Sequence, residues 1–192
     1  GDEVDADGDI TLKSNGNMQT DKAITAANDV NLTSVKGAMT IGSEVFATNG
    51  DITLQSKEDM QTAVTATLTA GDSVSLTSTD GAITVNADVT AVAGDITVAA
   101  EDDVTINADV SAKQAVMLTS ESAGITQAEE TGIQAQTVIV TSAEGVDLQG
   151  EGNEFGVLTV QSSEDETPIQ GSVLVQNSTN TTETMKLSVL SV

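Results

Sequence analysis

The pentapeptide GDITL occupies residues 8–12 and returns at residues 50–54, and a near copy, GDITV, occupies residues 94–98. The copies are 42 and 44 residues apart, with diverged copies between them at residues 28–32 (NDVNL) and 72–76 (DSVSL). The underlying period is therefore about 21 residues. Each unit alternates apolar, polar and apolar residues, which is typical of a β-strand, and Thr, Val and Ile favour that conformation.

Three such units recur in every period. The first begins at Ile10, Val30, Ile52, Val74, Ile96, Val116, Val138 and Leu158; the second begins at Met18, Met39, Met60, Ile83, Val104, Ile125 and Val146; the third ends at Ala26, Ala47, Ala70, Ala91, Ala112 and Ala135. A serine column (Ser14, Ser34, Ser56, Ser78, Ser120, Ser142 and Ser162) keeps the same spacing. The pattern predicts tight corners and one coil of a solenoid per period.

We therefore predict an all-β fold, a right-handed three-sheet parallel β-helix of about seven or eight coils of about 21 residues, with the usual hand of parallel crossovers. The limits of the repeat divide the chain into an N-terminal lead-in at residues 1–7, a repeat domain at 8–162 and a C-terminal cap or assembly segment at 163–192. The last segment contains the only proline, Pro168, and its strand-like stretches leave the 21-residue register.

The composition restricts the possible functions. Thirty acidic residues and six lysines give a net charge of −24, which should repel nucleic acid and anionic membrane surfaces. We expect no nucleic-acid partner and no membrane insertion, because no run reaches the length of a membrane-spanning helix. His, Cys, Arg, Tyr and Trp are absent, so the common general base, thiol nucleophile and anion clamp are missing. We predict that the protein is not an enzyme and needs no cofactor.

Carboxylates are the remaining reactive groups. Asp9, Asp29 and Asp51 precede the first strand of successive coils, and Asp102 and Asp103 lie in an acidic corner. Stacked carboxylates are weak candidates for loosely bound calcium, whose ligands are hard oxygens. The simpler interpretation is that each Asp closes a turn by accepting a backbone hydrogen bond. A carbohydrate-cleaving β-helix with paired carboxylates is a further alternative.

The repeats GDITLxS, ITA, DVxLTS and GAMTI resemble the β-helical shafts of filamentous-haemagglutinin-type adhesins, which are exoproteins of bacterial two-partner secretion. The resemblance covers roughly residues 8–162. It implies an extended protein that is extracellular or at the cell surface, in which the repeats space or display other parts. The export segment of that family has no counterpart in these residues.

The open ends of a solenoid expose unpaired backbone groups that can template association. We therefore expect a non-catalytic subunit of a surface fibre or matrix filament whose partner is itself, joined end to end; the alternative is the shaft of a longer adhesin chain. The predicted assembly residues are Met185, Lys186, Leu187, Ser188, Val189, Leu190, Ser191 and Val192.

Overall fold

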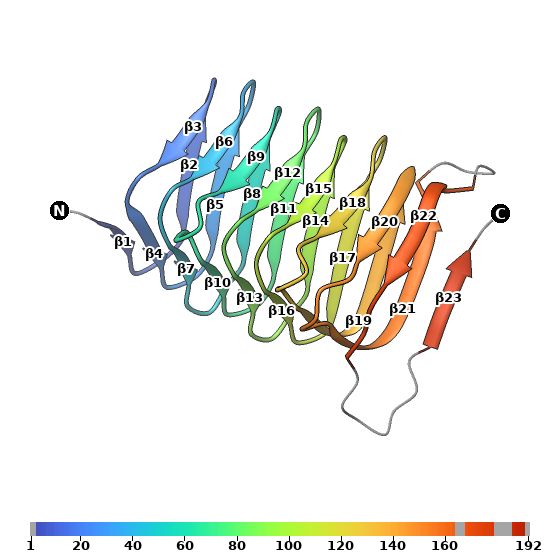
Figure 1. Ribbon diagram of the computed structural model, residues 1–192. Helices are drawn as coiled ribbons and strands as arrows, with labels where there is room; N and C mark the ends of the chain where they lie inside the picture. Colours follow the sequence, from blue (N-terminus) through green and yellow to red (C-terminus); the bar gives the residue numbers. More distant parts are fainter. Residues whose placement is uncertain (1–2, 164–167, 179–185, 191–192) are drawn as a thin grey trace.

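The protein folds as a stack of β-coils (Figure 1). The computed structural model describes residues 3–163, 168–178 and 186–190, and the regular structure in those residues is β-strand throughout, with no helix. Every strand pairing there is parallel. The same residues contain no helix that could cross a bilayer. The predicted all-β parallel solenoid of about 21-residue coils is confirmed.

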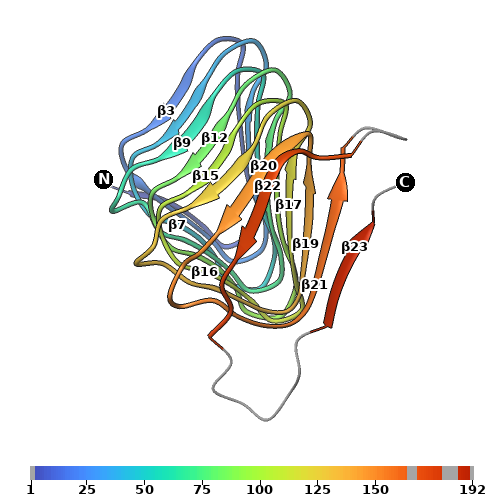
Figure 2. The same ribbon diagram turned by 45° about the vertical axis from the view of Figure 1, so that its right-hand side comes forward.

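The strands lie on three faces around one interior (Figure 2). The first face holds β2 (Ile10–Ser14), β5 (Val30–Ser34), β8 (Ile52–Ser56), β11 (Val74–Ser78), β14 (Ile96–Ala100) and β17 (Ala115–Ser120). The second face holds β3 (Met18–Thr20), β6 (Met39–Ile41), β9 (Met60–Thr62), β12 (Ile83–Val85), β15 (Val104–Ile106), β18 (Ile125–Gln127) and β20 (Glu144–Leu148). The third face holds β1 (Glu3–Ala6), β4 (Ala23–Ala26), β7 (Val45–Ala47), β10 (Leu68–Ala70), β13 (Val89–Ala91) and β16 (Val110–Ala112).

The first and third faces merge at the C-terminal end. β19 (Ile133–Ser142) and β21 (Glu154–Ser162) each run from the third face onto the first without a break. These strands join two of the three faces into one 15-stranded sheet, and the seven second-face strands named above form a separate 8-stranded sheet with β22 (Gln170–Val175). The eight strands of the second face correspond to about eight coils, in agreement with the sequence period.

Side chains alternate between the interior and solvent along every face. The outer residues of each three-residue unit are buried and the middle residue is not, as in β8, β12 and β16. The interior is aliphatic through most of the stack, and Phe46 lies on the outer side between Thr25 and Thr69. Phe155 is the exception: it is 2% exposed and lies opposite Ala135, at the end of the alanine column. One aromatic ring therefore fills the corner where the column stops.

The C-terminal segment continues the stack after longer connections. β22 (Gln170–Val175) pairs with β20, so that Val173 lies opposite Val146. β23 (Lys186–Leu190) pairs with β21, so that Leu187 lies opposite Leu158. The 21-residue spacing is lost because more residues separate these strands from their partners in the sequence, while the strands remain parallel and stacked.

We expect the alanine corner of the third face to reject a larger side chain. Ala91 is 2% exposed and lies between Ala70 and Ala112 in the stack. Ala91→Leu should overpack this corner and cost about 1–3 kcal/mol, which urea unfolding measures as a lower midpoint.

Thr97→Ala is the control for that variant, because Thr97 lies between the buried Ile96 and Val98 in β14 and faces outward. It should cost less than about 1 kcal/mol. Equal urea midpoints for the two variants would show that the assignment of inward and outward positions is wrong.

Candidate functional site

The aspartates before the first-face strands form a ladder of hydrogen bonds between coils. Oδ1 of Asp9 accepts the N–H of Asp29 at 3.3 Å, and Oδ1 of Asp29 accepts the N–H of Asp51 at 2.9 Å. Oδ1 of Asp51 accepts the N–H of Ser73 at 2.9 Å. The acceptor therefore serves the backbone of the following coil, whereas the simpler sequence interpretation placed this bond within the same turn. Each bond ties two coils together at a corner.

The other two corners use the same arrangement. Where the second face begins, Oδ1 of Asn17 accepts from the N–H of Ala38 at 3.2 Å, and Oδ1 of Asp59 accepts from that of Ala82 at 3.0 Å. Where the third face begins, Oδ1 of Asp109 accepts from the N–H of Gly132 at 2.8 Å. An Asx residue at a corner is thus an inter-coil acceptor, and the sequence shows it as Asp or Asn just before a strand.

This ladder explains the glycine of the repeated GD pair. A Cβ on Gly50 would overlap Oδ1 of Asp29, the carboxylate of the preceding coil. Gly81 stands in the same relation to Asp59. Gly8, in the first described coil, has no atom within 4 Å of a built Cβ. The glycine is required because the carboxylate of the preceding coil occupies the space that a side chain would need.

The proposed metal ligands fall into two separate groups. Asp9, Asp29 and Asp51 share the first-face column described above. Asp102 and Asp103 lie at the next corner, where Oδ1 of Asp103 accepts the N–H of Gly124 at 3.2 Å and Oδ1 of Asp102 accepts the Ser122 hydroxyl at 3.3 Å. Within the described ranges, no three acidic, His or Cys side chains converge in a way that could hold a metal ion. Calcium binding therefore stays a prediction.

The serine column closes the corner between the first and second faces. The Ser34 hydroxyl donates to the carbonyls of Gly16 and Gly37 at 2.7 and 2.9 Å. Ser120 and Ser142 make the same kind of bond to turn carbonyls. These serines are 0–1% exposed, so their hydroxyls satisfy carbonyls that water does not reach. These bonds lie at the tight corners that the spacing of the column predicts.

A buried pair of side-chain amides was not predicted from the sequence. Nε2 of Gln127 donates to Oδ1 of Asn153 at 2.8 Å, and Nδ2 of Asn153 donates back to Oε1 of Gln127 at 2.9 Å. Asn153 is fully buried, and its Oδ1 also accepts the N–H of Ile133 at 2.8 Å. The sequence signal is a Gln at an inward position that is apolar in neighbouring coils. This pair ties the last coils together.

The N-terminal end of the stack is open. Among the described residues, no strand lies beyond β1, β2 or β3. Leu12 is 37% exposed, whereas its equivalents Leu32 and Leu54 are completely buried. Val4 is 41% exposed and Met18 is half-buried. Side chains that belong to the interior thus meet solvent beside an unpaired row of backbone groups.

The C-terminal end is built differently. β22 and β23 are the last strands of the second and first faces, and on the third face a side chain takes the place of a strand. Val173 and Leu174 of β22 are 38% and 47% exposed. Oδ1 of Asn177 accepts the N–H of Phe155 at 3.2 Å, and Nδ2 of Asn177 donates to the Phe155 carbonyl at 3.0 Å. Of the predicted assembly residues, 186–190 form β23 on the chain's own β21. Met185, Ser191 and Val192 lie outside the described residues.

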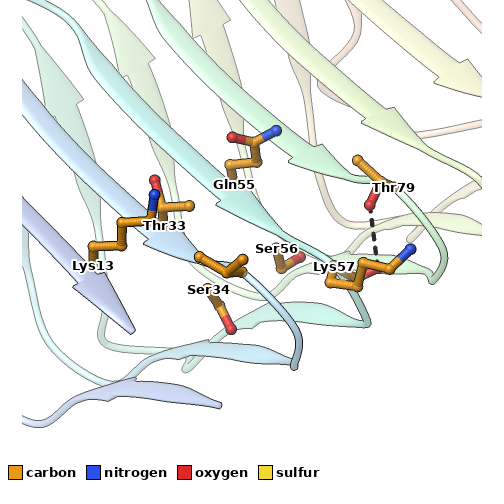
Figure 3. A pocket seen from close by; sticks show the side chains of 8 residues that line it. Lys13, Thr33, Ser34, Gln55, Ser56, Lys57 and Thr79 are labelled. Carbon is orange, nitrogen blue, oxygen red and sulfur yellow. Dashed lines mark hydrogen bonds between the residues drawn. The ribbon is translucent and has the colours of Figure 1, made fainter. Parts of the chain in front are cut away.

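A shallow pocket lies where the first face ends in the early coils (Figure 3). Lys13 and Lys57 flank it, and Thr33, Gln55 and Thr79 lie between or beside them. Lys57 forms an ion pair with Asp80 of the next coil, and the hydroxyl of Thr79 donates to the Lys57 carbonyl at 3.5 Å. The pocket is thus lined by two lysines and by neutral polar side chains.

Comparisons with protein-family models, with curated protein sequences and with solved structures found no match to this chain. The candidate functional surfaces therefore rest on the geometry of this chain alone.

The glycine of the GD pair gives a matched test of the corner ladder. Gly50→Ala should cost about 1–3 kcal/mol of unfolding free energy, because the new Cβ would displace the Asp29 carboxylate. Gly8→Ala changes the same residue in the same pentapeptide but meets open space, so it should be neutral or stabilising by up to about 1 kcal/mol. Urea midpoints compare the two variants, and a Gly8 variant as unstable as the Gly50 variant would contradict the ladder.

Substitution of Asp29 separates its two proposed roles. Asp29→Ala removes the acceptor of the Asp51 N–H and should cost about 1–2 kcal/mol, whereas Asp29→Asn keeps Oδ1 and should change stability by less than about 0.5 kcal/mol. Urea unfolding with EDTA or with calcium measures both roles. If calcium raises the midpoint of the wild-type protein and not that of Asp29→Asn, the column binds the metal.

Proposed function

We propose that the protein is a non-catalytic extracellular structural element, a subunit of a fibre or matrix filament that associates through the ends of its coils. The observation that carries this proposal is the open N-terminal end, where Leu12 is 37% exposed and its equivalents in later coils are buried. Extending the stack by one coil from another chain would bury that side chain and pair the backbone of the edge.

The backbone direction at this edge supports association by strand addition. The N–H of Ile10 donates to the carbonyl of Asp29 in the next coil at 2.8 Å. Because successive residues of a strand direct their N–H and C=O groups to opposite sides, those of Thr11 and Lys13 face away from β5. Main-chain hydrogen bonding across a sheet edge needs no particular side-chain chemistry.

The composition supports a structural role and suggests an environment. The chain lacks His, Cys, Arg, Tyr and Trp, and its acidic residues lie mostly at corners, away from the outward rows of the first face. A net charge of −24 keeps such rods soluble and makes their association depend on salt. The resemblance of the repeats to filamentous-haemagglutinin-type shafts supports an extracellular or surface location.

A second candidate function is the shaft of a longer secreted adhesin. The parallel register of the described coils continues up to the strands at both ends, so further coils of the same chain could extend it in either direction. In that case the N-terminal edge is covered by preceding residues of the same protein. The length of the complete gene product separates the two candidates.

Proline at the edge tests end association. Thr11→Pro removes an N–H that faces the open edge and places a ring there, a position at which edge strands tolerate proline. The variant should keep the circular dichroism of the wild-type protein and lose concentration-dependent association in sedimentation velocity. Thr11→Ala is the matched control, and it should associate like the wild-type protein because it keeps the N–H.

Two results would contradict the proposal. One is association of Thr11→Pro at the same concentrations as the wild-type protein. The other is a wild-type chain that stays monomeric at high concentration with salt and calcium added, in which case the adhesin-shaft function takes its place.

A further inference from the structure

The exposed edge of β2 can pair with a second copy of itself. The groups free at this edge belong to alternate positions, Asp9, Thr11 and Lys13, since Ile10 bonds to the next coil. When two β2 strands meet edge to edge in opposite directions, the residues with free backbone groups in one strand lie opposite the residues with free backbone groups in the other. If Thr11 lies on the two-fold axis, Asp9 of each copy lies opposite Lys13 of its partner.

The charges around β2 favour this register. Lys13 is the single charged residue among the outward side chains of the described first-face strands up to β21. Asp9 is exposed at the start of the same strand. An antiparallel pair centred on Thr11 therefore places Asp9 of each copy opposite Lys13 of the other. The joint then has two symmetric cross-strand pairs of opposite charge, and such pairs stabilise a sheet. A shift by two residues moves Lys13 opposite Thr11 and loses both pairs.

The inward side chains fit the same arrangement. Ile10 of one copy lies opposite Leu12 of the other, on the interior side of the joined sheet. A two-fold axis perpendicular to the first face also brings the second face of one copy next to the third face of the other. Met18 of β3 then lies on the same side as Val4 of the partner's β1, and the exposed ends of both cores cover each other.

From these relations we propose that the end association named above is a symmetric joint between two N-terminal ends, with β2 antiparallel to β2 of a second copy, Thr11 on the two-fold axis and Asp9 opposite Lys13. The proposal rests on the proposed function and specifies its geometry. A two-fold joint closes on itself, so it yields a dimer of twice the rod length, whereas head-to-tail stacking yields an open fibre.

The lysines are concentrated toward the N-terminal end. Four of the six lysines, Lys13, Lys22, Lys36 and Lys57, lie in the first three coils, and only Lys186 follows Lys113. Exposed apolar side chains occur at both ends: Val4 and Leu12 are 41% and 37% exposed at the N-terminal end, and Val173 and Leu174 of β22 are 38% and 47% exposed at the C-terminal end. The joint between two N-terminal ends is therefore favoured by the opposite charges of Asp9 and Lys13 along the β2 edge, and not by a difference in apolar exposure.

Cysteine cross-linking tests the geometry, because the chain contains no cysteine. Across the two-fold axis the Cα atoms of the two Thr11 residues are about 5.5 Å apart, a separation that a disulfide can span. Thr11→Cys alone should give a covalent dimer on mild oxidation, seen on a non-reducing gel. Thr97→Cys, in the middle of the same face, is the matched control and should stay monomeric.

A mixture of two variants distinguishes this joint from head-to-tail stacking. In a head-to-tail stack Thr11 would follow Ser188, which takes the register position of Thr159 in β23. Cross-linking of Thr11→Cys to Ser188→Cys, without a Thr11→Cys homodimer, would overturn the symmetric joint and leave end association intact. Absence of any cross-link, together with a monomeric wild-type protein, would overturn both.

Charge exchange tests the register. Lys13→Glu should weaken the dimer about tenfold, because two attractive pairs become repulsive, and Asp9→Lys should weaken it similarly. The double variant Asp9→Lys with Lys13→Glu restores both pairs and should bind more tightly than either single variant in sedimentation equilibrium. The loss of the Asp9 acceptor for the Asp29 N–H is measured separately, as a lower urea midpoint of the variants that carry Asp9→Lys. Lys36→Glu makes the same charge change at the corner that follows β5, away from the β2 edge, and is the control that should have little effect. A double variant weaker than either single variant would overturn the register.

Discussion

The constraint on which the structure depends is the spacing between coils. Parallel strands lie about 4.8 Å apart, so every residue of one coil must be compatible with the residue directly above and below it. Along the faces this is met by backbone hydrogen bonds and by apolar side chains of similar size. At the corners it is met by an Asx oxygen that accepts the N–H of the following coil, as Asp29 does for Asp51. The sequence repeats because each coil must match its neighbours at this spacing.

The same constraint makes the two ends of the molecule different. In the middle of the stack each edge is covered by the next coil, and Leu32 and Leu54 are fully buried. At the C-terminal end β22 and β23 are the last strands of the second and first faces, and the Asn177 amide replaces a strand beside Phe155. At the N-terminal end the described residues supply no equivalent, and Leu12 meets solvent. The proposed end association rests on the exposure of this edge.

Polar groups inside the stack are used sparingly and each has partners. Gln127 and Asn153 bond to each other and to the backbone around them, and in the described residues no buried side-chain N or O lacks a hydrogen bond. A buried amide pair of this kind is satisfied only when both partners are aligned, so it favours one alignment of the last coils over slipped ones. It lies just before the spacing between stacked positions of the second face increases from 21 residues (Ile125 to Val146) to 27 residues (Val146 to Val173), where the period alone no longer defines the register.

The sequence by itself determined the solenoid, its period, and the inward and outward positions, because a parallel stack repeats its environment every coil and a repeated environment selects repeated residues. It also identified Asp9, Asp29 and Asp51 as one column. Only the tertiary structure decided that their oxygens bond to the next coil, that β19 and β21 merge two faces, that Gln127 pairs with Asn153, and that 186–190 lie on β21. These features depend on contacts between unlike positions, which leave no period in the sequence.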